Sequence, residues 1–173
     1  MDELAERLER LCRISLFSDI VHDQQSMRDI ACLFRKKTYR EGEEIITEGR
    51  HGNELYILKA GIVAVEKKTL QGDPYTVTAL SADANDFFGE MALLDDDRRS
   101  ATVRCTTQVE AFLLSREDFL LLGNRNPLAG LAVTRALSRI LCKRLRKANQ
   151  DIITLFGALV EEMSESGGVG GVE

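Results

Sequence analysis

Six short runs of β-prone residues fill the middle of the chain, between Lys37 and Leu114. Each run gathers Val, Ile, Leu, Tyr, Thr or Phe over a few residues and ends at glycine, aspartate or asparagine, which is typical of strands rather than helices. The runs cover residues 38–43, 45–49, 55–58, 62–65, 76–80 and 109–114. They predict a mainly β fold with flanking helices, in which an antiparallel barrel or jelly roll forms the centre.

Glycines fall at the corners between the early runs. Gly42, Gly49, Gly52 and Gly61 are each expected in a tight turn with positive φ, which glycine adopts without steric cost. Residues 71–74 are expected to form the tip of a hairpin, and no chemistry is assigned to them.

Helices are predicted on both sides of the β region. Apolar residues at helical spacing predict helices over residues 3–13 and 24–34, and Ser115 with Asp118 predicts a capped helix over 116–123. Asn126 and Pro127 suit the start of another helix, and nothing clearly stops it before Met163. The expected regions are N-terminal helices over 1–36, a β-roll over 37–115, C-terminal helices over 116–163 and a disordered glycine-rich tail over 164–173.

The long C-terminal helix carries a heptad pattern. Six apolar positions follow the spacing 4-3-4-3-4, which is typical of a coiled-coil seam: Leu141, Leu145, Ala148, Ile152, Leu155 and Leu159. Ile140, Ile153 and Phe156 supply a second apolar face that is expected to serve the barrel. The pattern favours a homodimer through helix 127–163, and the alternative is a stripe that packs on the chain's own barrel.

Residues 87–103 carry the strongest chemical signal. Gly89 allows a close approach of backbone to ligand and opens a short helical turn, whose first amides have no partner within the turn and favour phosphate. Arg99 and Ser100 add a guanidinium fork and a hydroxyl to the same anion. Glu90 repels phosphate but accepts hydrogen bonds from neighbouring sugar hydroxyls. The alternative is a structural Glu90–Arg99 ion pair without a ligand.

The sequence from Phe88 to Leu94, followed by that from Arg99 to Val103, resembles the phosphate-binding cassette of cyclic nucleotide-binding domains. The resemblance implies a ribose contact from Glu90 and a cyclic phosphate held by Arg99 and Ser100. It places the ligand-binding residues at Gly89, Glu90, Met91, Ala92, Arg99, Ser100 and Ala101, with Asn149 of the long helix against the base. A solvated helix amide is the alternative for Asn149. Arg98 stands where the family often has proline, which puts the rigidity of the loop in question.

Charge and cysteine content exclude other classes of protein. The net charge of −5 disfavours nucleic acid as a partner, and neither a membrane span nor a signal peptide is visible, so the protein is expected in the cytoplasm. The four cysteines, Cys12, Cys32, Cys105 and Cys142, are widely separated. They are expected to be partly buried, reduced thiols without a metal.

These observations predict a non-enzymatic sensor. It is expected to bind cAMP in preference to cGMP and to signal to an unidentified downstream protein through rearrangement of its C-terminal helix. Because the sequence ends in the glycine-rich tail, without the helix-turn-helix of related transcription factors, no DNA binding is expected. Two alternatives stay open: a dimeric interaction protein whose cassette is empty, or a fragment of a transcriptional regulator.

Overall fold

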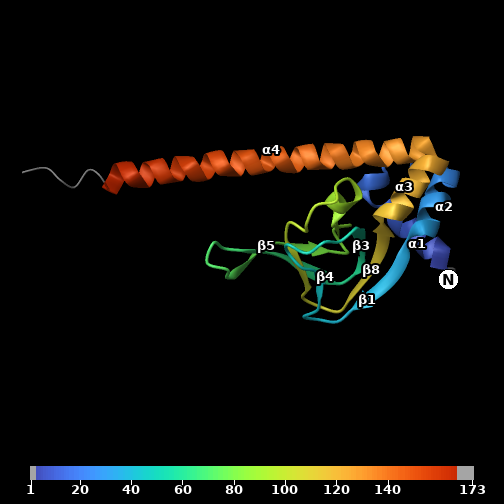
Figure 1. Ribbon diagram of the computed structural model, residues 1–173, viewed down its shortest axis with the longest axis horizontal. Coiled ribbons are helices and arrows are strands. Elements are labelled where there is room, and N and C mark those ends of the chain that lie inside the picture. The colour runs from blue at the N-terminus through green and yellow to red at the C-terminus, as the bar shows by residue number, and fades with distance from the viewer. Residues whose placement is uncertain (1–2, 167–173) are drawn as a thin grey trace, which may run out of the picture. The chain divides into compact units, whose positions relative to one another are not determined.

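The computed structural model describes residues 3–166, and it divides the chain into two compact units, Met1–Ala136 and Leu137–Glu173. Figure 1 shows the elements of both units. The helices are α1 (Glu3–Cys12), η1 (Ser15–Phe17), α2 (Gln24–Leu33), η2 (Glu90–Leu93), α3 (Arg116–Arg125) and α4 (Pro127–Ser166). The strands are β1 (Arg35–Tyr39), β2 (Glu44–Ile46), β3 (Glu54–Ala60), β4 (Ile62–Lys68), β5 (Pro74–Ser81), β6 (Phe87–Phe88), β7 (Thr102–Cys105) and β8 (Val109–Ser115).

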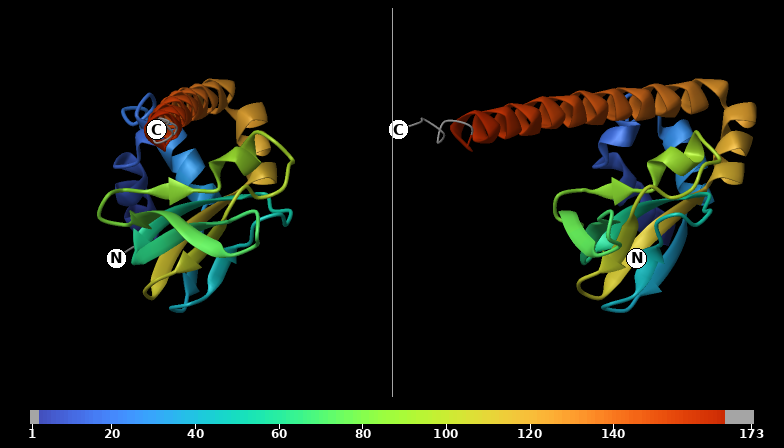
Figure 2. Two further views of the ribbon diagram at one scale, coloured as in Figure 1. Left: turned by 90° about the vertical axis from the view of Figure 1, so that its left-hand side faces the viewer. Right: turned by 60° about the vertical axis from the view of Figure 1, so that its left-hand side comes forward.

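Two four-stranded antiparallel sheets form the centre of the first unit, which confirms the predicted jelly-roll class. Their strand orders are β1-β8-β3-β6 and β2-β7-β4-β5, and Figure 2 shows them from two further sides. One cluster of buried side chains draws on both sheets, including Tyr56 and Leu58 of β3 and Val63 of β4. The core therefore lies between the sheets, as alternation of side chains along the strands requires.

The first sheet is buried on its other face as well. Leu55 and Ile57 of β3 and Phe112 of β8 alternate with the residues of the inter-sheet core and are fully buried. The helices of the first unit contribute their own buried residues, and Phe17 meets Phe34 edge to face at 6.2 Å between ring centroids. Burial on both faces explains why β3 and β8 read as nearly continuous apolar runs.

Most predicted elements are present, with corrections at their ends. β1 begins at Arg35, two residues before the change of period that the sequence predicts at Lys37. The sequence did not indicate this earlier start, because residues 35–38 are all exposed and show no alternation of buried and exposed positions. α4 runs as one helix to Ser166, so the first residues of the predicted tail are helical. The remainder of the tail, 167–173, lies outside the described residues.

The caps and turns follow the sequence closely. The Ser115 hydroxyl accepts a hydrogen bond from the Asp118 amide at 3.1 Å, and the Asn126 side chain accepts one from the Ala129 amide at 3.1 Å. Gly42, Gly49 and Gly61 have positive φ as predicted. The prediction was wrong for Gly52, whose φ is not positive; its lack of a side chain serves a different purpose, described below.

The cysteines are free, but only Cys105 is buried, whereas Cys12, Cys32 and Cys142 are exposed. The expectation of partly buried positions was therefore wrong for three of them. Burial raises the pKa of the Cys105 thiol to about 11. Among residues 3–166, no helix combines the length and apolarity that crossing a membrane requires, and no group of three His, Cys, Asp or Glu side chains is arranged to hold a metal ion.

Candidate anion-binding site

A sharp turn at Gly89 joins β6 to the short helix η2. β6 pairs with β3 through Tyr56 and Phe88, and the chain then reverses at Gly89, whose φ of 76° lies in the left-handed region. The first hydrogen bond of η2 runs from the Ala92 amide to the Gly89 carbonyl at 3.2 Å. The amides of Glu90 and Met91 precede that bond, so this end of the turn presents N–H groups to an anion.

The side chain of Arg99 is held at this turn. Its guanidinium donates to the Glu54 carbonyl at 2.9 Å and to the Gly89 carbonyl at 3.2 Å. It also lies 5.9 Å from the ring centre of Tyr56, which stacks on Phe88 at 5.1 Å. Both hydrogen bonds go to carbonyl oxygens and not to the carboxylate of Glu90. These two hydrogen bonds to neutral backbone groups fix the guanidinium in place.

Two glycines make room for that guanidinium. A Cβ on Gly52 would lie 2.5 Å from Nε of Arg99, and a Cβ on Gly89 would lie 2.9 Å from one of its terminal nitrogens and 2.7 Å from the Glu54 carbonyl oxygen. Real Cβ atoms do not approach other heavy atoms this closely. Glycine is therefore required at both positions for Arg99 to keep its place.

Backbone hydrogen bonds fix the loop that carries Arg99. The Arg99 amide donates to the Arg50 carbonyl at 2.8 Å, and the Arg99 carbonyl accepts from the Gly49 amide at 2.9 Å. Arg98 adds a bond from its guanidinium to the Gly49 carbonyl at 3.2 Å, and its amide donates to the Asp97 carboxylate at 2.7 Å. The loop is thus anchored to residues 49–50, with Arg98 at the position where the resemblance often implies proline.

The electrostatics favour an anion beside Arg99. Burial lowers the pKa of the Arg99 guanidinium, and the neighbouring Tyr56, Glu54 and Glu90 oppose this shift. Burial also raises the pKa of Tyr56, whose hydroxyl donates to Glu54 at 2.6 Å. A partly desolvated cation whose hydrogen bonds go to neutral carbonyls gains more from an anionic ligand than a solvated one does.

Gly89, Glu90, Met91 and Ala92 form this turn, and the side chain of Arg99 contacts it. Glu90 and Ala92 are buried on η2, Met91 is exposed beside them, and Arg99, Ser100 and Ala101 follow along the anchored loop. Asn149 lies on α4 within the second unit, so its contact with a base stays a prediction.

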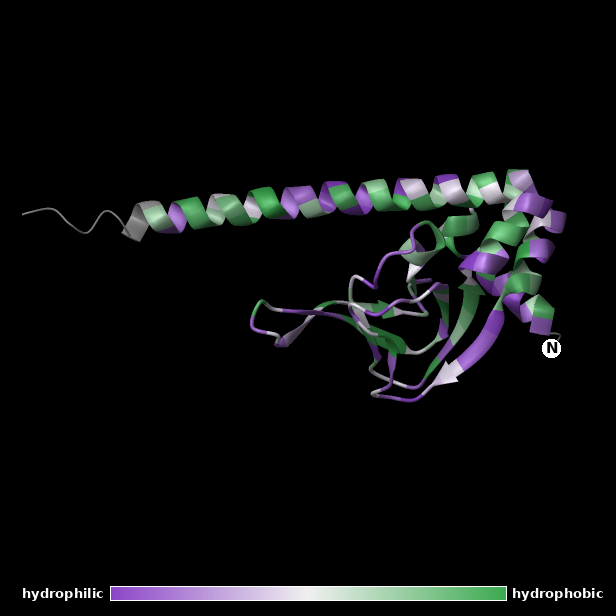
Figure 3. Ribbon diagram, in the orientation of Figure 1, coloured by the Kyte–Doolittle hydropathy of each residue, from purple (hydrophilic) through white to green (hydrophobic). Residues whose placement is uncertain are grey.

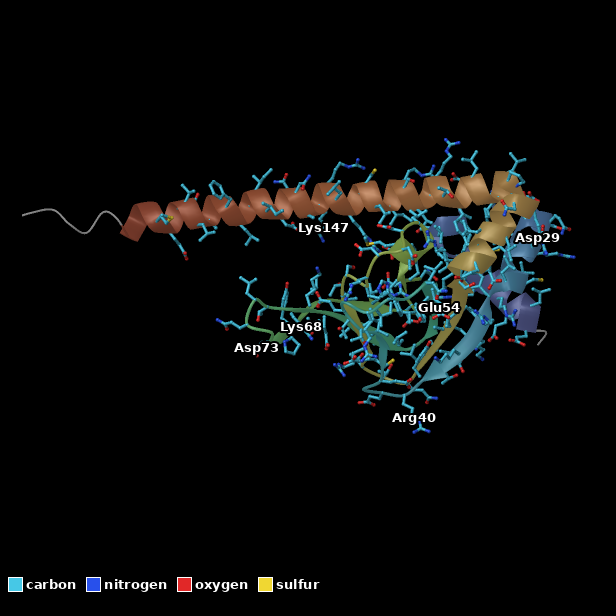
Figure 4. All side chains as sticks on the ribbon, in the orientation of Figure 1. Asp29, Arg40, Glu54, Lys68, Asp73 and Lys147 are labelled. Atoms are coloured by element: carbon cyan, nitrogen blue, oxygen red, sulfur yellow. The ribbon has the colours of Figure 1, made fainter. Side chains whose placement is uncertain are left out.

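Three residues near Arg99 were not predicted as part of the site. Gly52 gives Arg99 space, the Glu54 carbonyl accepts its hydrogen bond, and Tyr56 lies under it. Figure 4 labels the position of Glu54. Only Gly52 carried a signal in the sequence, as a glycine among turn residues, and that signal indicated a turn rather than a binding site.

Comparison with known proteins agrees with this geometry. Residues 36–126 match the model of the cyclic nucleotide-binding domain. A cyclic AMP receptor protein from Thermus thermophilus is 34% identical over 119 residues, 69% of this chain and 52% of that protein. A cGMP-dependent protein kinase from Eimeria tenella is 35% identical over 98 residues, 56% of this chain and 9% of the kinase.

The fold has a solved counterpart. The crystal structure of the Thermus thermophilus catabolite activator protein superimposes with a TM-score of 0.72 at 30% identity, covering 82% of this chain and 62% of that one. The chain therefore spans about half of the length of its curated Thermus relative and a small part of the kinase.

Proposed function

The chain belongs to the cyclic nucleotide-binding domain family, and on that premise we propose that it is a non-catalytic sensor that binds a 3′,5′-cyclic nucleotide, cAMP in preference to cGMP. The observation that carries the proposal is the fixed guanidinium of Arg99, held beside the Gly89 turn by the Glu54 and Gly89 carbonyls. The cyclic phosphate binds to this guanidinium, to the amides at the start of η2 and to Ser100.

Once the phosphate is placed, contacts for the ribose and the base of the ligand can be assigned. Glu90 lies on the same turn as Gly89 and is 3% exposed, so its carboxylate is suited to accept a hydrogen bond from the ribose 2′-hydroxyl rather than from water. Asn149 offers both a donor and an acceptor to a purine edge. The cAMP preference draws on the Thermus relative, which is named for cyclic AMP, whereas the Eimeria kinase is named for cGMP.

Ligand binding is transmitted to other proteins through the C-terminal helix. We expect the chain to act as a homodimer paired along helix 127–163 and to pass the signal to a downstream protein without contacting DNA itself. The ligand shifts the arrangement of this helix because it binds more tightly to one arrangement than to the other. Supporting this proposal, Leu145, Ile152 and Leu155 of the heptad seam are each more than 60% exposed.

Calorimetric titration of the protein with cAMP and with cGMP tests the proposal. We expect one site per chain, tighter for cAMP, and a loss of at least about 100-fold in affinity in Arg99→Ala, because a charge-assisted pair of hydrogen bonds is removed. Arg98→Ala is the matched control: its guanidinium donates to the Gly49 carbonyl, and the backbone hydrogen bonds between Arg99 and residues 49–50 remain, so binding should change little.

The alternative is a cassette that binds nothing. It predicts no heat with cAMP, cGMP or a cyclic dinucleotide and no rise in the melting temperature when they are added, whereas a ligand of the native state must raise it. Either result with the wild-type protein would refute the sensor function.

A further inference from the structure

Glu54 accepts two hydrogen bonds, from different partners. Its backbone carbonyl accepts one from the guanidinium of Arg99 at 2.9 Å, and its carboxylate accepts one from the hydroxyl of Tyr56 at 2.6 Å. Glu54 is the first residue of β3, and Figure 3 shows the apolar residues (green) that gather in the strands of this unit. A partly buried carboxylate in such surroundings requires a hydrogen bond, and the Tyr56 hydroxyl supplies one.

The geometry of β3 brings these two side chains together. Glu54 and Tyr56 are two residues apart on one strand, so their side chains point to the same face of the sheet. The buried Tyr56 ring stacks on Phe88 with an interplanar angle of 8°, which fixes the direction of its hydroxyl. Burial raises the pKa of Tyr56, so the hydroxyl stays protonated and donates to Glu54.

The Glu54 carboxylate has a second possible partner close by. Burial lowers the pKa of Arg99, and the charge of Glu54 is among the causes that oppose this shift, so the carboxylate lies near enough to act on the guanidinium. Because the Glu54 carbonyl already bonds Arg99, a change of rotamer is sufficient to turn the carboxylate toward it. Arginine–carboxylate pairs are strong and often bidentate. Such a pair would occupy N–H groups that a phosphate needs.

We propose that the Tyr56 hydroxyl holds the Glu54 carboxylate away from Arg99 and so keeps the guanidinium available to the cyclic phosphate. Tyr56 is thus a positioning residue, which acts on the ligand through Glu54 and Arg99. The inference rests on the proposed function, because it takes the cyclic phosphate as the anion that Arg99 binds. It explains how a cation site for an anion tolerates a carboxylate on the residue next to it.

Tyr56→Phe tests the proposal, because it removes the hydroxyl and keeps the ring. We expect the affinity for cAMP, measured by titration calorimetry, to fall by about 10-fold. In the variant, Glu54 pairs with Arg99 in most ligand-free molecules, and the apparent affinity falls with the fraction of molecules that can bind. An affinity equal to that of wild type would overturn the proposal.

A second substitution distinguishes this role from a purely structural one. Adding Glu54→Gln to Tyr56→Phe should raise the affinity again by about 10-fold, because the amide cannot form the ion pair with Arg99. The same substitution should raise the affinity by a much smaller factor in the wild-type background, where the hydroxyl already holds the side chain. Equal factors in the two backgrounds would mean that Glu54 acts only through its charge, and would overturn the role of Tyr56.

Glu43→Gln in the Tyr56→Phe background is the matched control for the rescue. The Glu43 carboxylate accepts from the Arg40 amide at 2.9 Å, so this variant removes one negative charge of the same unit without changing Glu54. It should leave the affinity of Tyr56→Phe as it is. Restoration by Glu43→Gln would assign the rescue to net charge and overturn the proposal.

The crystal structure of ligand-free Tyr56→Phe gives a test that does not depend on a cyclic nucleotide. We expect the Glu54 carboxylate within hydrogen-bond distance of the Arg99 guanidinium, whereas in crystals of the wild-type protein it should bond Tyr56. A carboxylate that stays away from Arg99 in the variant overturns the proposal. If the pair forms but the wild-type protein binds no cyclic nucleotide, the proposed function is refuted and the hold of Tyr56 on Glu54 is still supported.

Discussion

Arg99 and Lys59 are two partly buried cations of the same unit, and their surroundings are opposite. Arg99 donates to two backbone carbonyls, and burial lowers its pKa. Lys59, on β3, lies between two carboxylates, at 2.5 Å from Glu110 of β8 and 2.6 Å from Glu6 of α1. These two hydrogen-bonded carboxylates, that of Glu110 first, raise the pKa of Lys59.

The difference distinguishes a cation that is suited to bind a ligand, Arg99, from a cation that holds parts of the fold together, Lys59. The charge of Lys59 is matched by the protein itself, so it ties α1 to the sheet and has little left for a ligand. The charge of Arg99 is positioned by neutral groups, which fix the guanidinium without neutralising it. A partly buried cation whose hydrogen bonds go to backbone carbonyls is a better indication of an anion site than a cation that is hydrogen-bonded to two carboxylates.

After the loss of Arg99 itself, the largest effect on binding is expected from Gly52→Ala, which moves Arg99 without changing its charge. The new Cβ would lie 2.5 Å from Nε of Arg99, and the flexible side chain can move away. We expect cAMP affinity to fall by about 10- to 100-fold, as titration calorimetry would measure, because the two directed hydrogen bonds and the phosphate position are lost together. The melting temperature should change little, since the backbone at position 52 is unstrained for alanine.

Gly42→Ala is the converse control for that variant. Gly42 has a φ of 79° and no atom near the position of a Cβ, so alanine there strains the backbone but leaves Arg99 alone. It should lower the melting temperature and leave the affinity unchanged. Wild-type affinity in Gly52→Ala would show that the placement of Arg99 is not what binds the phosphate.

The sequence predicted the site residues that lie close together in the chain. It missed those whose role depends on how distant segments of the chain are paired. Gly89, Glu90 and Arg99 fall within one short stretch whose glycine, carboxylate and guanidinium are each visible as such. The role of Gly52 depends on the backbone hydrogen bond from the Arg99 amide to the Arg50 carbonyl, which brings the two loops together and which no local sequence pattern encodes. The contact of Lys59 with Glu6 joins residues far apart in the chain for the same reason.

The long helix α4 is another case in which the sequence predicts the element but not the contacts that it makes. Its start at Pro127 and its length follow from the cap at Asn126 and from the absence of later proline. Its heptad pattern indicates that a partner covers it, but what packs against Ile153 and Val160 is decided by another chain or segment. A pattern within one chain can indicate such a face and not its occupant.

A smaller effect, on stability alone, is expected from Lys59→Met. The variant leaves the carboxylates of Glu6 and Glu110 facing each other without the cation between them, with only Lys36 near Glu110 at 3.2 Å. We expect the melting temperature to fall by about 2–4 °C in differential scanning calorimetry, and cAMP affinity to stay within about twofold of wild type. Lys67→Met, at an exposed position of β4, should change neither. A large loss of affinity in Lys59→Met would contradict the inference that Lys59 stabilises the fold and takes no part in ligand binding.

The smallest effect should appear only in acid, in Glu110→Gln. The hydrogen bond from Lys59 lowers the pKa of Glu110 below its ordinary value of 4.5. A carboxyl whose pKa is depressed in the folded state adds stability above its unfolded pKa and loses that contribution as the pH falls through the folded pKa.

Glu110→Gln should therefore be less stable than wild type at pH 7, by about 1 kcal/mol or less for this partly exposed pair, and the two proteins should converge as the pH falls below about 4.5. Urea unfolding at a series of pH values measures this difference. Glu9→Gln is the matched control, since the Glu9–Arg13 pair is mostly exposed, at 65% and 58%, and should give no measurable difference at any pH. A stability gap for Glu110→Gln that persists unchanged into acid would mean that Glu110 stabilises the fold through packing and not through its charge beside Lys59.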